Sequence, residues 1–290
     1  MLHIIYNPRA GHGKSVRFRD AVVPRLQALQ IPYQLHETKQ KYHAAEITRE
    51  LTADGAEHTI VAMGGDGTVH EILNGMQDPS KICFGILPAG SGNDFASVAG
   101  IPKDPIAALD LILYSEPKFT DYMDCSGVRG MNAIGTGFDV DVLRRCYHFK
   151  RLHGKLKYLA ATLLTLTDFE FYRFRLEHNG IEEEHEGFLV CAGNGKGIGG
   201  GLRVCPDAVL DDGLLDFVFV DKIAPWQYPY ALLHLLTGRL LRLPYVHLQR
   251  KDHVSAQFLP PAPVEIDGEI YEDLPFDIRI VHNALRMFRP

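Results

Sequence analysis

The sequence has few cysteines and no long apolar run, and each shortage excludes a class of protein. Five cysteines are scattered along 290 residues without a C-x-x-C pair. A disulfide framework or a structural zinc site is therefore not expected, and a reducing cytoplasm is the predicted compartment. No apolar run is long enough to span a bilayer, so no transmembrane segment is predicted. Residues 1–6 enter a strand-like segment directly, so no signal peptide is expected.

An excess of basic residues is also missing. The formal net charge is -6 and the sequence pI is near 6.1, so the overall charge gives no indication of nucleic-acid binding. Internal repeats and low-complexity segments are absent from the sequence. What the chain does have is material for a sizeable core, since 46% of its residues are hydrophobic. A chain of this length divides most naturally into two domains.

Short apolar runs alternate with amphipathic stretches over the first hundred residues. This alternation predicts βαβ units, and hence an N-terminal α/β domain with a parallel sheet and helices on both faces. Ligands bind such sheets at the carboxyl ends of the strands. The expected strands are 2–6, 33–37, 59–63 and 84–87, and the expected helices are 15–29, 42–51, a helix beginning at 69, and 93–99.

The pattern changes after about residue 120, where strand-like segments are separated by Gly, Pro, Asn and Asp turns. It predicts a mainly antiparallel β domain, a sandwich or an open barrel. We place the two domains at 1–121 and 122–290, with a return of the last residues to the first domain as an alternative. The expected strands are 131–134, 171–177, 187–192, 214–220, 254–258, 264–266 and 276–281, and the expected helices are 152–169 and 226–241.

The first glycine-rich turn, residues 7–15, ends in Gly13-Lys14-Ser15 and suggests a P-loop. That motif needs another glycine five residues before Gly13, where this chain has Pro8, so we reject a Walker A site. A glycine-rich turn entering a helix still exposes backbone N–H groups, and Lys14 adds positive charge for phosphate. An ordinary turn with solvated basic residues is an equally supported interpretation.

The second turn, residues 64–68, reads Gly-Gly-Asp-Gly-Thr between an apolar strand and a helix. Three glycines let the backbone approach a ligand closely, and Thr68 is expected to cap the following helix. Asp66 has no attraction for phosphate unless a cation intervenes, which makes it a candidate ligand of Mg²⁺. A tight turn with a solvated aspartate is the weaker alternative.

Two further glycine-rich segments are less informative. In segment 88–96, Ser91 or Asn93 could cap a helix, and Asp94 would be a second acid near the same sheet edge. Segment 193–201, in the β-rich part, is equally well explained as a mobile loop or as a ligand contact.

Taken together and in order, these motifs resemble the bacterial diacylglycerol kinase-like lipid kinases, relatives of the eukaryotic diacylglycerol and sphingosine kinases. The resemblance covers nearly the whole chain, and the later motifs make it specific, since G-G-D-G-T alone also occurs in NAD kinases. It implies an NAD kinase/phosphofructokinase-like first domain and a β-sandwich second domain. The matching segments are 7–11, 64–71 (G-G-D-G-T-V-H-E), 90–96 (G-x-x-N-D-F-A), 135–139 (G-T-G-F-D), 206–208, 211–216 and 267–269 (D-G-E).

The resemblance implies an enzyme that transfers the γ-phosphate of ATP to a lipid hydroxyl, with diacylglycerol as the leading acceptor. The reasoning from the residues adds Lys14 and Gly64 to the nucleotide site. The ATP-binding positions implied by the resemblance are Asn7, Thr38, Gly65, Asp66, Gly67, Thr68, Val69, His70, Glu71 and Ser91.

The resemblance also implies the metal sites and the catalytic base. Asp66, Asp94 and an acid at the domain junction would hold a catalytic Mg²⁺ through water, and we favour Asp124 over Asp121 for the junction. Glu269 would be the catalytic base, and Asp267 and Asp66 are the other two predicted catalytic residues. A second, structural Mg²⁺ would use Val209, Asp212 and Leu214. From the residues alone, a hairpin turn is the better explanation of segment 267–269, and only the family match gives Glu269 a catalytic role. A hairpin turn with two exposed acids also explains segment 211–213 well.

Contact with a membrane is expected if the acceptor is a membrane lipid, on the inner face of the membrane. Segment 225–242 is apolar and aromatic with basic residues toward its end, and could lie on an anionic surface together with Lys150, Arg151, Lys155 and Lys157. A helix packed on the β domain is the favoured alternative, and a homodimer is left open. The rival functions are a kinase for a soluble acceptor such as NAD and a non-catalytic nucleotide- or lipid-binding regulator. Segment 69–75 favours the lipid branch.

Overall fold

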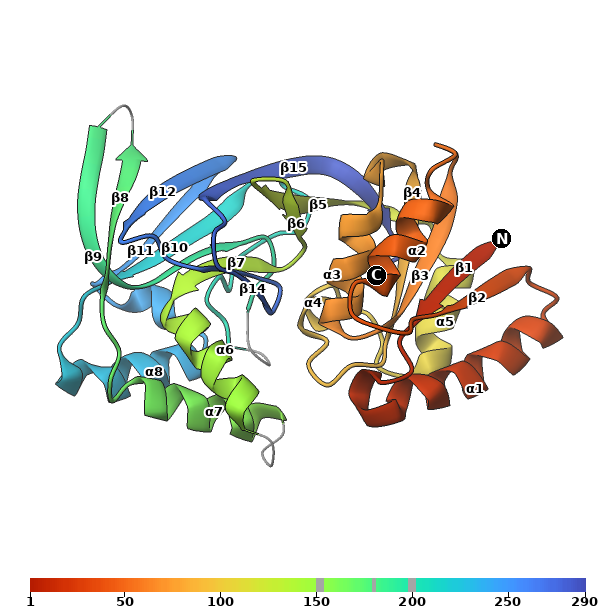
Figure 1. Ribbon diagram of the computed structural model, residues 1–290, viewed down its shortest axis with the longest axis horizontal. Coiled ribbons are helices and arrows are strands. Elements are labelled where there is room, and N and C mark those ends of the chain that lie inside the picture. Colours follow the sequence, from red (N-terminus) through yellow and green to blue (C-terminus); the bar gives the residue numbers. More distant parts are fainter. Residues whose placement is uncertain (150–153, 179–180, 198–201) are drawn as a thin grey trace. The chain divides into compact units, whose positions relative to one another are not determined.

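The computed structural model describes residues 1–149, 154–178, 181–197 and 202–290 (Figure 1). Two compact units are present: Met1–Tyr122 together with His282–Pro290, and Met123–Val281. The chain passes between them within strands β5 (Lys118–Cys125) and β15 (Phe276–Met287). Lys150, Arg151, the start of the helix expected at 152 and the end of the glycine-rich segment 193–201 lie outside the described residues, as does the side chain of Lys155.

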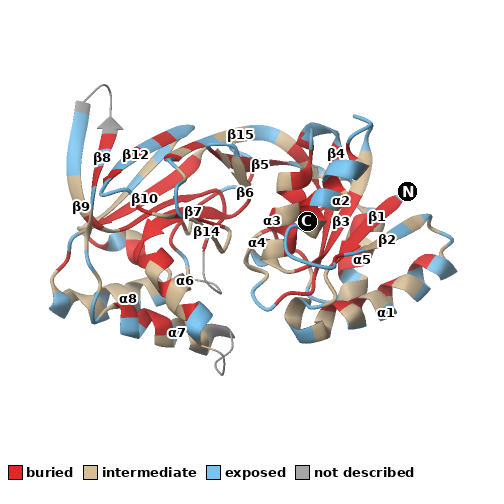
Figure 2. Cartoon of the chain, viewed as in Figure 1, coloured by how far each residue is buried: buried red, intermediate tan, exposed pale blue. Residues whose placement is uncertain are grey.

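The first unit contains a parallel sheet, as predicted, in the order β15-β4-β3-β1-β2. Its central strands are nearly continuous apolar runs because both faces are covered, and they are buried (Figure 2). Helices α1 and α5 pack together, as do α2 and α3. The bounds are β1 Leu2–Tyr6, β2 Tyr33–Glu37, β3 His58–Gly64, β4 Ile82–Pro88, α1 Lys14–Ala28, α2 His43–Leu51, α3 Asp66–Gly75, α4 Asp94–Val98 and α5 Pro105–Tyr114, with 3-10 turns at Ala10–Gly13 and Pro79–Lys81.

Helix α5 was not predicted, although its start carries a clear local signal. Pro105 is its first residue, and the carboxylate of Asp104 accepts hydrogen bonds from the N–H groups of Ile106 (3.0 Å) and Ala107 (2.9 Å). An aspartate N-cap followed by proline is a typical helix start. The helix was missed because its apolar residues begin immediately after Asp104 and Pro105 and resemble a short apolar run.

The second unit is mainly antiparallel, as predicted. Its strands follow the order β14-β13-β7-β9-β8-β12-β15, with β10 between β9 and β11 and with β6 beside β5. β12 alternates exposed and buried residues along its whole length, so one face of it contributes to the core. The bounds are β6 Val128–Gly130, β7 Ala133–Gly137, β8 Tyr172–His178, β9 Ile181–Gly193, β10 Leu215–Asp221, β11 Val246–Lys251, β12 His253–Leu259, β13 Val264–Ile266 and β14 Glu269–Tyr271.

The helices of the second unit differ from expectation. α6 (Phe138–His148) was not predicted, and α7 covers Gly154–Thr165. The helix expected at 226–241 is interrupted: a 3-10 turn at Pro225–Gln227 precedes α8 (Tyr228–Leu236), and another at Leu240–Arg242 follows it. Gly238 has a φ of 67°, a left-handed conformation that ends helices. The three helices lie on the same side of this unit's sheet (Figure 1).

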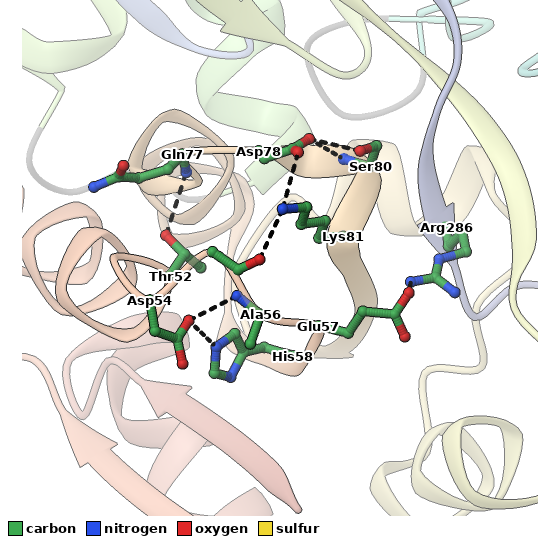
Figure 3. Close-up of polar contacts among 11 residues, drawn as sticks. Thr52, Asp54, Ala56, Glu57, His58, Gln77, Asp78, Ser80, Lys81 and Arg286 are labelled. Carbon is green, nitrogen blue, oxygen red and sulfur yellow. Dashed lines mark hydrogen bonds and ion pairs between the residues drawn. The ribbon is translucent and has the colours of Figure 1, made fainter.

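Side-chain contacts tie the C-terminal strand and two loops together at the amino-terminal edge of the first unit's sheet (Figure 3). Arg286 on β15 forms an ion pair with Glu57 (2.9 Å) just before β3. Lys81 Nζ donates to the Gly55 carbonyl (2.8 Å), and the Gln77 N–H donates to Thr52 Oγ1 (3.2 Å). These contacts anchor the amino-terminal ends of β3 and β4.

Three histidines from neighbouring strands meet on one face of the same sheet. His3 Nδ1 lies 3.3 Å from His36 Nε2, and the His3 ring centroid is 5.5 Å from the centroids of both His36 and His58. Burial lowers the pKa of His3, and the neighbouring His36 and His58 rings lower it further. Burial also lowers the pKa of His36. The folded unit therefore favours the neutral forms of His3 and His36.

These lowered pKa values predict a loss of stability in mild acid. A histidine whose pKa is lower in the folded than in the unfolded chain stabilises the fold fully above the unfolded value, near 6.5, and this contribution is lost as pH falls toward the folded pKa. Each unit of lowering corresponds to about 1.4 kcal/mol in the free energy of unfolding. We expect His3→Gln to flatten the pH dependence of urea denaturation curves, measured by circular dichroism between pH 7.5 and pH 5.

The matched control is His234→Gln on α8, in the second unit, where Nδ1 lies 2.9 Å from the Tyr230 carbonyl oxygen. It should keep the wild-type pH dependence. The interpretation is wrong if His3→Gln and His234→Gln change the denaturation curves equally.

Candidate functional site

Three glycine-rich turns converge at the carboxyl edge of the parallel sheet, after β1, β3 and β4. The Gly64 carbonyl accepts hydrogen bonds from the N–H groups of Ala89 (2.8 Å) and Gly90 (3.0 Å), which join the second turn to the third. The first turn is joined to both. The Asn7 N–H donates to the Met63 carbonyl (3.1 Å), and Lys14 Nζ donates to the Pro88 carbonyl (3.1 Å).

The contact between the second and third turns requires glycine on both sides. A Cβ at Gly90 would overlap the Cα of Gly65, and a Cβ at Gly65 would stand 3.0 Å from the Cα of Gly90. In the first turn, a Cβ at Gly11, where φ is 56°, would overlap the Ala89 carbonyl oxygen. The glycines therefore let the three turns pack backbone against backbone.

Asp66 connects these turns through its side chain. The Asn93 N–H donates to Oδ2 (2.8 Å) and the Phe95 N–H to Oδ1 (3.4 Å), so the carboxylate lies at the amino-terminal end of α4. A Cβ at Gly92 would stand 3.0 Å from Asp66 Oδ2 and 3.8 Å from Asp94 Oδ2. The structure thus brings together the two acids that the sequence placed at one sheet edge.

The predicted helix caps are wrong. α3 begins at Asp66 with Gly65 at the N-cap, so Thr68 lies inside the first turn, where its side chain fills the space beside Gly64. Asn93 occupies the N-cap of α4, but its Oδ1 accepts from the Gly90 N–H (2.8 Å) instead of from a helix N–H. The acceptor at the start of α4 is instead the carboxylate of Asp66, which lies 27 positions before Asn93 in the chain.

The remaining predicted nucleotide residues divide into two groups. Thr38 directly follows β2, is buried, and its N–H donates to the Tyr6 carbonyl (2.9 Å), so it lies at the same carboxyl edge. Val69 and His70 are buried within α3. Glu71 Oε2 accepts from the Ala44 N–H (3.1 Å) in the first turn of α2, where a carboxylate is favourable for the helix dipole. Val69, His70 and Glu71 therefore contact other parts of the first unit than the three glycine-rich turns.

In the second unit, Asp267 and Gly268 form the two-residue loop between β13 and β14. Their φ angles are 50° and 94°, as in the type I′ turn that favours Asp-Gly. The Asp267 carboxylate accepts three backbone hydrogen bonds, which suit it to positioning this loop, and Glu269 is the first residue of β14. The donors are the N–H groups of Met131 (2.6 Å), Asn132 (2.9 Å) and Ala133 (3.1 Å).

β7 begins at Ala133 and not at Met131 as expected. The N–H groups of Met131 and Asn132, which precede the strand, and of Ala133, its first residue, all donate to the Asp267 side chain. A side chain 135 positions from Asn132 thus holds the start of the strand.

The two candidate junction acids have different surroundings. Asp124 Oδ1 accepts from the Gly127 N–H (3.0 Å) in the turn between β5 and β6. Asp121 is fully buried in the first unit, where its Oδ1 accepts from the Asn283 N–H (2.7 Å) and lies 3.0 Å from His282 Nδ1. Asp121 therefore joins β5 to β15.

The proposed structural metal site lies in the turn before β10. Asp212 is exposed and its Oδ1 accepts from the Leu214 N–H (3.0 Å), an arrangement that a turn produces without a metal. Val209 is also exposed. Within the part of the chain that the structure describes, no group of three or more His, Cys, Asp or Glu residues is arranged to hold a metal ion.

A buried acid at the start of α6 had been given no role from the sequence. Asp139 Oδ1 accepts from the Val140 N–H (2.8 Å), and Oδ2 packs against Gly135. Burial raises the pKa of Asp139 to about 7. The G-T-G-F-D motif marked the segment, but nothing in its local pattern indicates that the acid is buried.

Comparison with known proteins assigns the class of this chain. Residues 1–125 match the family model "Diacylglycerol kinase catalytic domain", and residues 132–289 match "YegS C-terminal NAD kinase beta sandwich-like domain". The chain is 30% identical to the "Diacylglycerol kinase" of Mycobacterium tuberculosis over 294 residues, covering 98% of this chain and 93% of that protein. It is 34% identical to the "Probable lipid kinase YegS-like" of Pseudomonas syringae pv. tomato over 286 residues, covering 92% and 88%.

A solved structure agrees with the fold. The crystal structure of a diacylglycerol kinase from Bacillus anthracis has a TM-score of 0.74 at 22% identity and covers 100% of this chain and 96% of that one. The family matches define an ATP-dependent kinase. The chain belongs to the diacylglycerol kinase and YegS-like family of lipid kinases. Among the described residues, no helix is long and apolar enough to cross a membrane.

The backbone contact between the turns predicts a specific steric effect. In Gly90→Ala the new methyl group would overlap Gly65, and neither backbone can move without breaking the hydrogen bonds to the Gly64 carbonyl. We expect the free energy of unfolding to fall by about 1–3 kcal/mol. ATP affinity, measured by isothermal titration calorimetry, should fall at least about tenfold because the turns can no longer pack together.

Gly13→Ala is the matched control in the first turn. Gly13 has a φ of 86°, and no atom lies within 4 Å of the added Cβ, so only a conformational cost of about 1 kcal/mol is expected. Equal losses of ATP affinity in the two variants would contradict the steric explanation.

Proposed function

We propose that this lipid kinase phosphorylates diacylglycerol and so forms phosphatidic acid. The observation that carries the proposal is the match over 98% of the chain to a relative named diacylglycerol kinase, in a chain whose three glycine-rich turns meet at one edge of the sheet. Other lipids also offer a hydroxyl on an apolar body, so the acceptor is the point that experiment must test.

The nucleotide phosphates would bind at the converging turns. The turns after β1 and β3 lead into α1 and α3, and a helix start offers unsatisfied N–H groups and a favourable dipole for an anion. Lys14 adds a cation at the same edge, since its Nζ is directed to the Pro88 carbonyl. Asn7, Gly64, Gly65, Gly67 and Ser91 supply the backbone around this position.

A magnesium ion fits the two acids at this edge. Mg²⁺ usually keeps several waters and binds through one or two carboxylates together with substrate phosphates. Asp66 and Asp94 supply two neighbouring carboxylates, and Asp124 is the proposed third. The ion would neutralise charge on the transferring phosphoryl group. The second Mg²⁺ at Val209, Asp212 and Leu214 is also a proposal, supported by the family resemblance.

Glu269 is the proposed general base. It would accept the proton of the acceptor hydroxyl as the hydroxyl oxygen attacks the γ-phosphorus of ATP; the bond from the γ-phosphorus to its bridging oxygen breaks, and ADP leaves. The three hydrogen bonds to Asp267 hold the loop that precedes Glu269. Asp267 thus acts as a positioning residue for the base.

Turnover with a panel of acceptors tests the proposed reaction. With Mg–ATP, we expect the highest kcat/KM on diacylglycerol in mixed micelles, lower values on a sphingoid base, a glycolipid and a polyprenol, and none on NAD. Chelation of the metal should abolish turnover. Phosphorylation of NAD alone, or of another lipid in preference to diacylglycerol, would show that the proposed acceptor is wrong.

Replacing the base should affect the chemical step and leave the fold unchanged. Glu269 is only partly buried, so Glu269→Gln should keep the wild-type melting temperature. Its kcat should fall by about 10²–10⁴, the usual contribution of general base catalysis, with little change in the KM for ATP. Glu272→Gln, three residues later and exposed in an ion pair with Arg144, is the control and should retain activity. Unchanged turnover in Glu269→Gln would remove Glu269 from the mechanism.

A further inference from the structure

Helix α8 has an unusual surface for a helix of a globular domain. Its sequence, YPYALLHLL, is almost entirely apolar, yet none of its residues is buried. Ala231 and Leu235 pack against the core cluster beneath the helix. The opposite face is exposed to solvent, so apolar side chains are presented where polar ones would be expected.

The exposed residues form a continuous stripe. Trp226, Tyr230, Leu233 and Leu236 are separated by four, three and three positions, which places them on one face of the helix and its preceding turn. Their exposed fractions are 81%, 56%, 56% and 55%. We call these four residues the α8 stripe.

Helix α7 extends the apolar surface. Leu159, Leu163 and Leu164 are exposed, while Ala161 and Thr165 on its other face are buried. The two helices share an aromatic neighbour, since the Phe188 ring centroid is 5.9 Å from Tyr228 on α8 and 4.8 Å from Phe169, which follows α7.

The sequence around these helices is rich in basic residues. Residues 142–167 and 222–251 together contain eleven Lys and Arg residues and not a single Asp or Glu, in a chain with a formal net charge of -6. Four of these cations form ion pairs: Arg144 with Glu272, Arg145 with Asp168, Lys222 with Glu186 and Arg250 with Asp216. Arg239 and Arg242, just after α8, are exposed and form no side-chain hydrogen bond or ion pair with residues that the structure describes.

We infer that the α8 stripe and the outer leucines of α7 form a docking surface for an anionic lipid bilayer, with α8 lying in the interface and Arg239 and Arg242 contacting lipid phosphates. Exposed leucines beside tryptophan, tyrosine and arginines have the composition of an interfacial helix. A bilayer matches both features, because it offers an apolar layer beneath negative charge. The purpose of this contact rests on the proposed lipid acceptor, but the binding can be tested without turnover.

Trp226 provides a native reporter, since it is the only tryptophan of the chain. We expect its fluorescence to shift to the blue when vesicles of equal parts phosphatidylcholine and phosphatidylglycerol are added, and to be quenched by brominated acyl chains. Vesicles of phosphatidylcholine alone should give a much weaker response. Absence of a blue shift with the anionic vesicles would overturn the inference.

Charge and apolar variants separate the two contributions. Arg239→Gln combined with Arg242→Gln should weaken binding about fivefold per arginine while keeping the Trp226 signal. The control, Lys39→Gln with Lys103→Gln, removes two exposed cations of the first unit and should have no effect.

In co-sedimentation, Trp226→Ser with Leu233→Ser should lower the partition coefficient at least about tenfold. Tyr114→Ser, 68% exposed in the first unit, is the apolar control. Equal effects in variants and controls would contradict a localised surface.

Turnover distinguishes a docking surface from a part of the active site. Trp226→Ser with Leu233→Ser should reduce phosphorylation of long-chain diacylglycerol in vesicles and leave that of a soluble short-chain diacylglycerol unchanged. A parallel loss on the short-chain acceptor would overturn the inference. The inference would also be overturned if sedimentation velocity showed that the wild-type protein is a dimer and that the Trp226→Ser, Leu233→Ser variant is a monomer, because a second copy would then cover the α8 stripe. Vesicle binding without turnover of either diacylglycerol would refute the proposed acceptor and leave the docking surface standing.

Discussion

The hydrogen bonds between Asp66 and the start of α4 hold the phosphate-binding edge of the first unit together. Without an acceptor from Asp66, the N–H groups of Asn93 and Phe95 would have to find another partner, and the third turn would lose its main side-chain link to the second. The contact also places a negative charge where nucleotide phosphates are expected. Such a charge is compatible with phosphate only when a cation lies between them, so one residue links the fold to the proposed Mg²⁺ chemistry.

The second unit uses an aspartate in a similar way. Asp267 accepts three backbone hydrogen bonds from residues 131–133 and so holds the β13–β14 loop against the start of β7. In both units a carboxylate satisfies N–H groups that a glycine-containing turn or a strand end leaves unpaired. Both aspartates lie beside residues with proposed catalytic roles, Asp94 in the first unit and Glu269 in the second. Rigid support of this kind is what a site needs to keep its reactive groups in position.

Local patterns predicted the elements better than their ends. A strand that is buried on both faces is a nearly continuous apolar run, as in β3 and β4. A strand that is buried on one face alternates buried and exposed residues, as in β12. Both patterns are visible in the sequence. β11 was missed because its sequence, VHLQRK, is too polar to resemble a strand. The cap assigned to Thr68 was wrong because α3 begins earlier, at Asp66. The caps suggested at Ser91 and Asn93 were wrong because the acceptor for α4 comes from a distant turn, and a local rule considers only neighbouring residues.

The sequence by itself determined the alternation of strands and helices in the first hundred residues, the β-rich character of the second part, the family, and the glycines at the carboxyl edge of the sheet, because periodicity and motif spacing are local properties. Only the tertiary structure decided which acids are neighbours, since Asp66 and Asp94 are 28 residues apart and meet only when β3 and β4 pair. It also decided which face of α8 is exposed. A helix that is apolar all round has no polar face to mark the solvent side, so the sequence left open whether this segment packs inward or presents leucine and tryptophan to the surroundings.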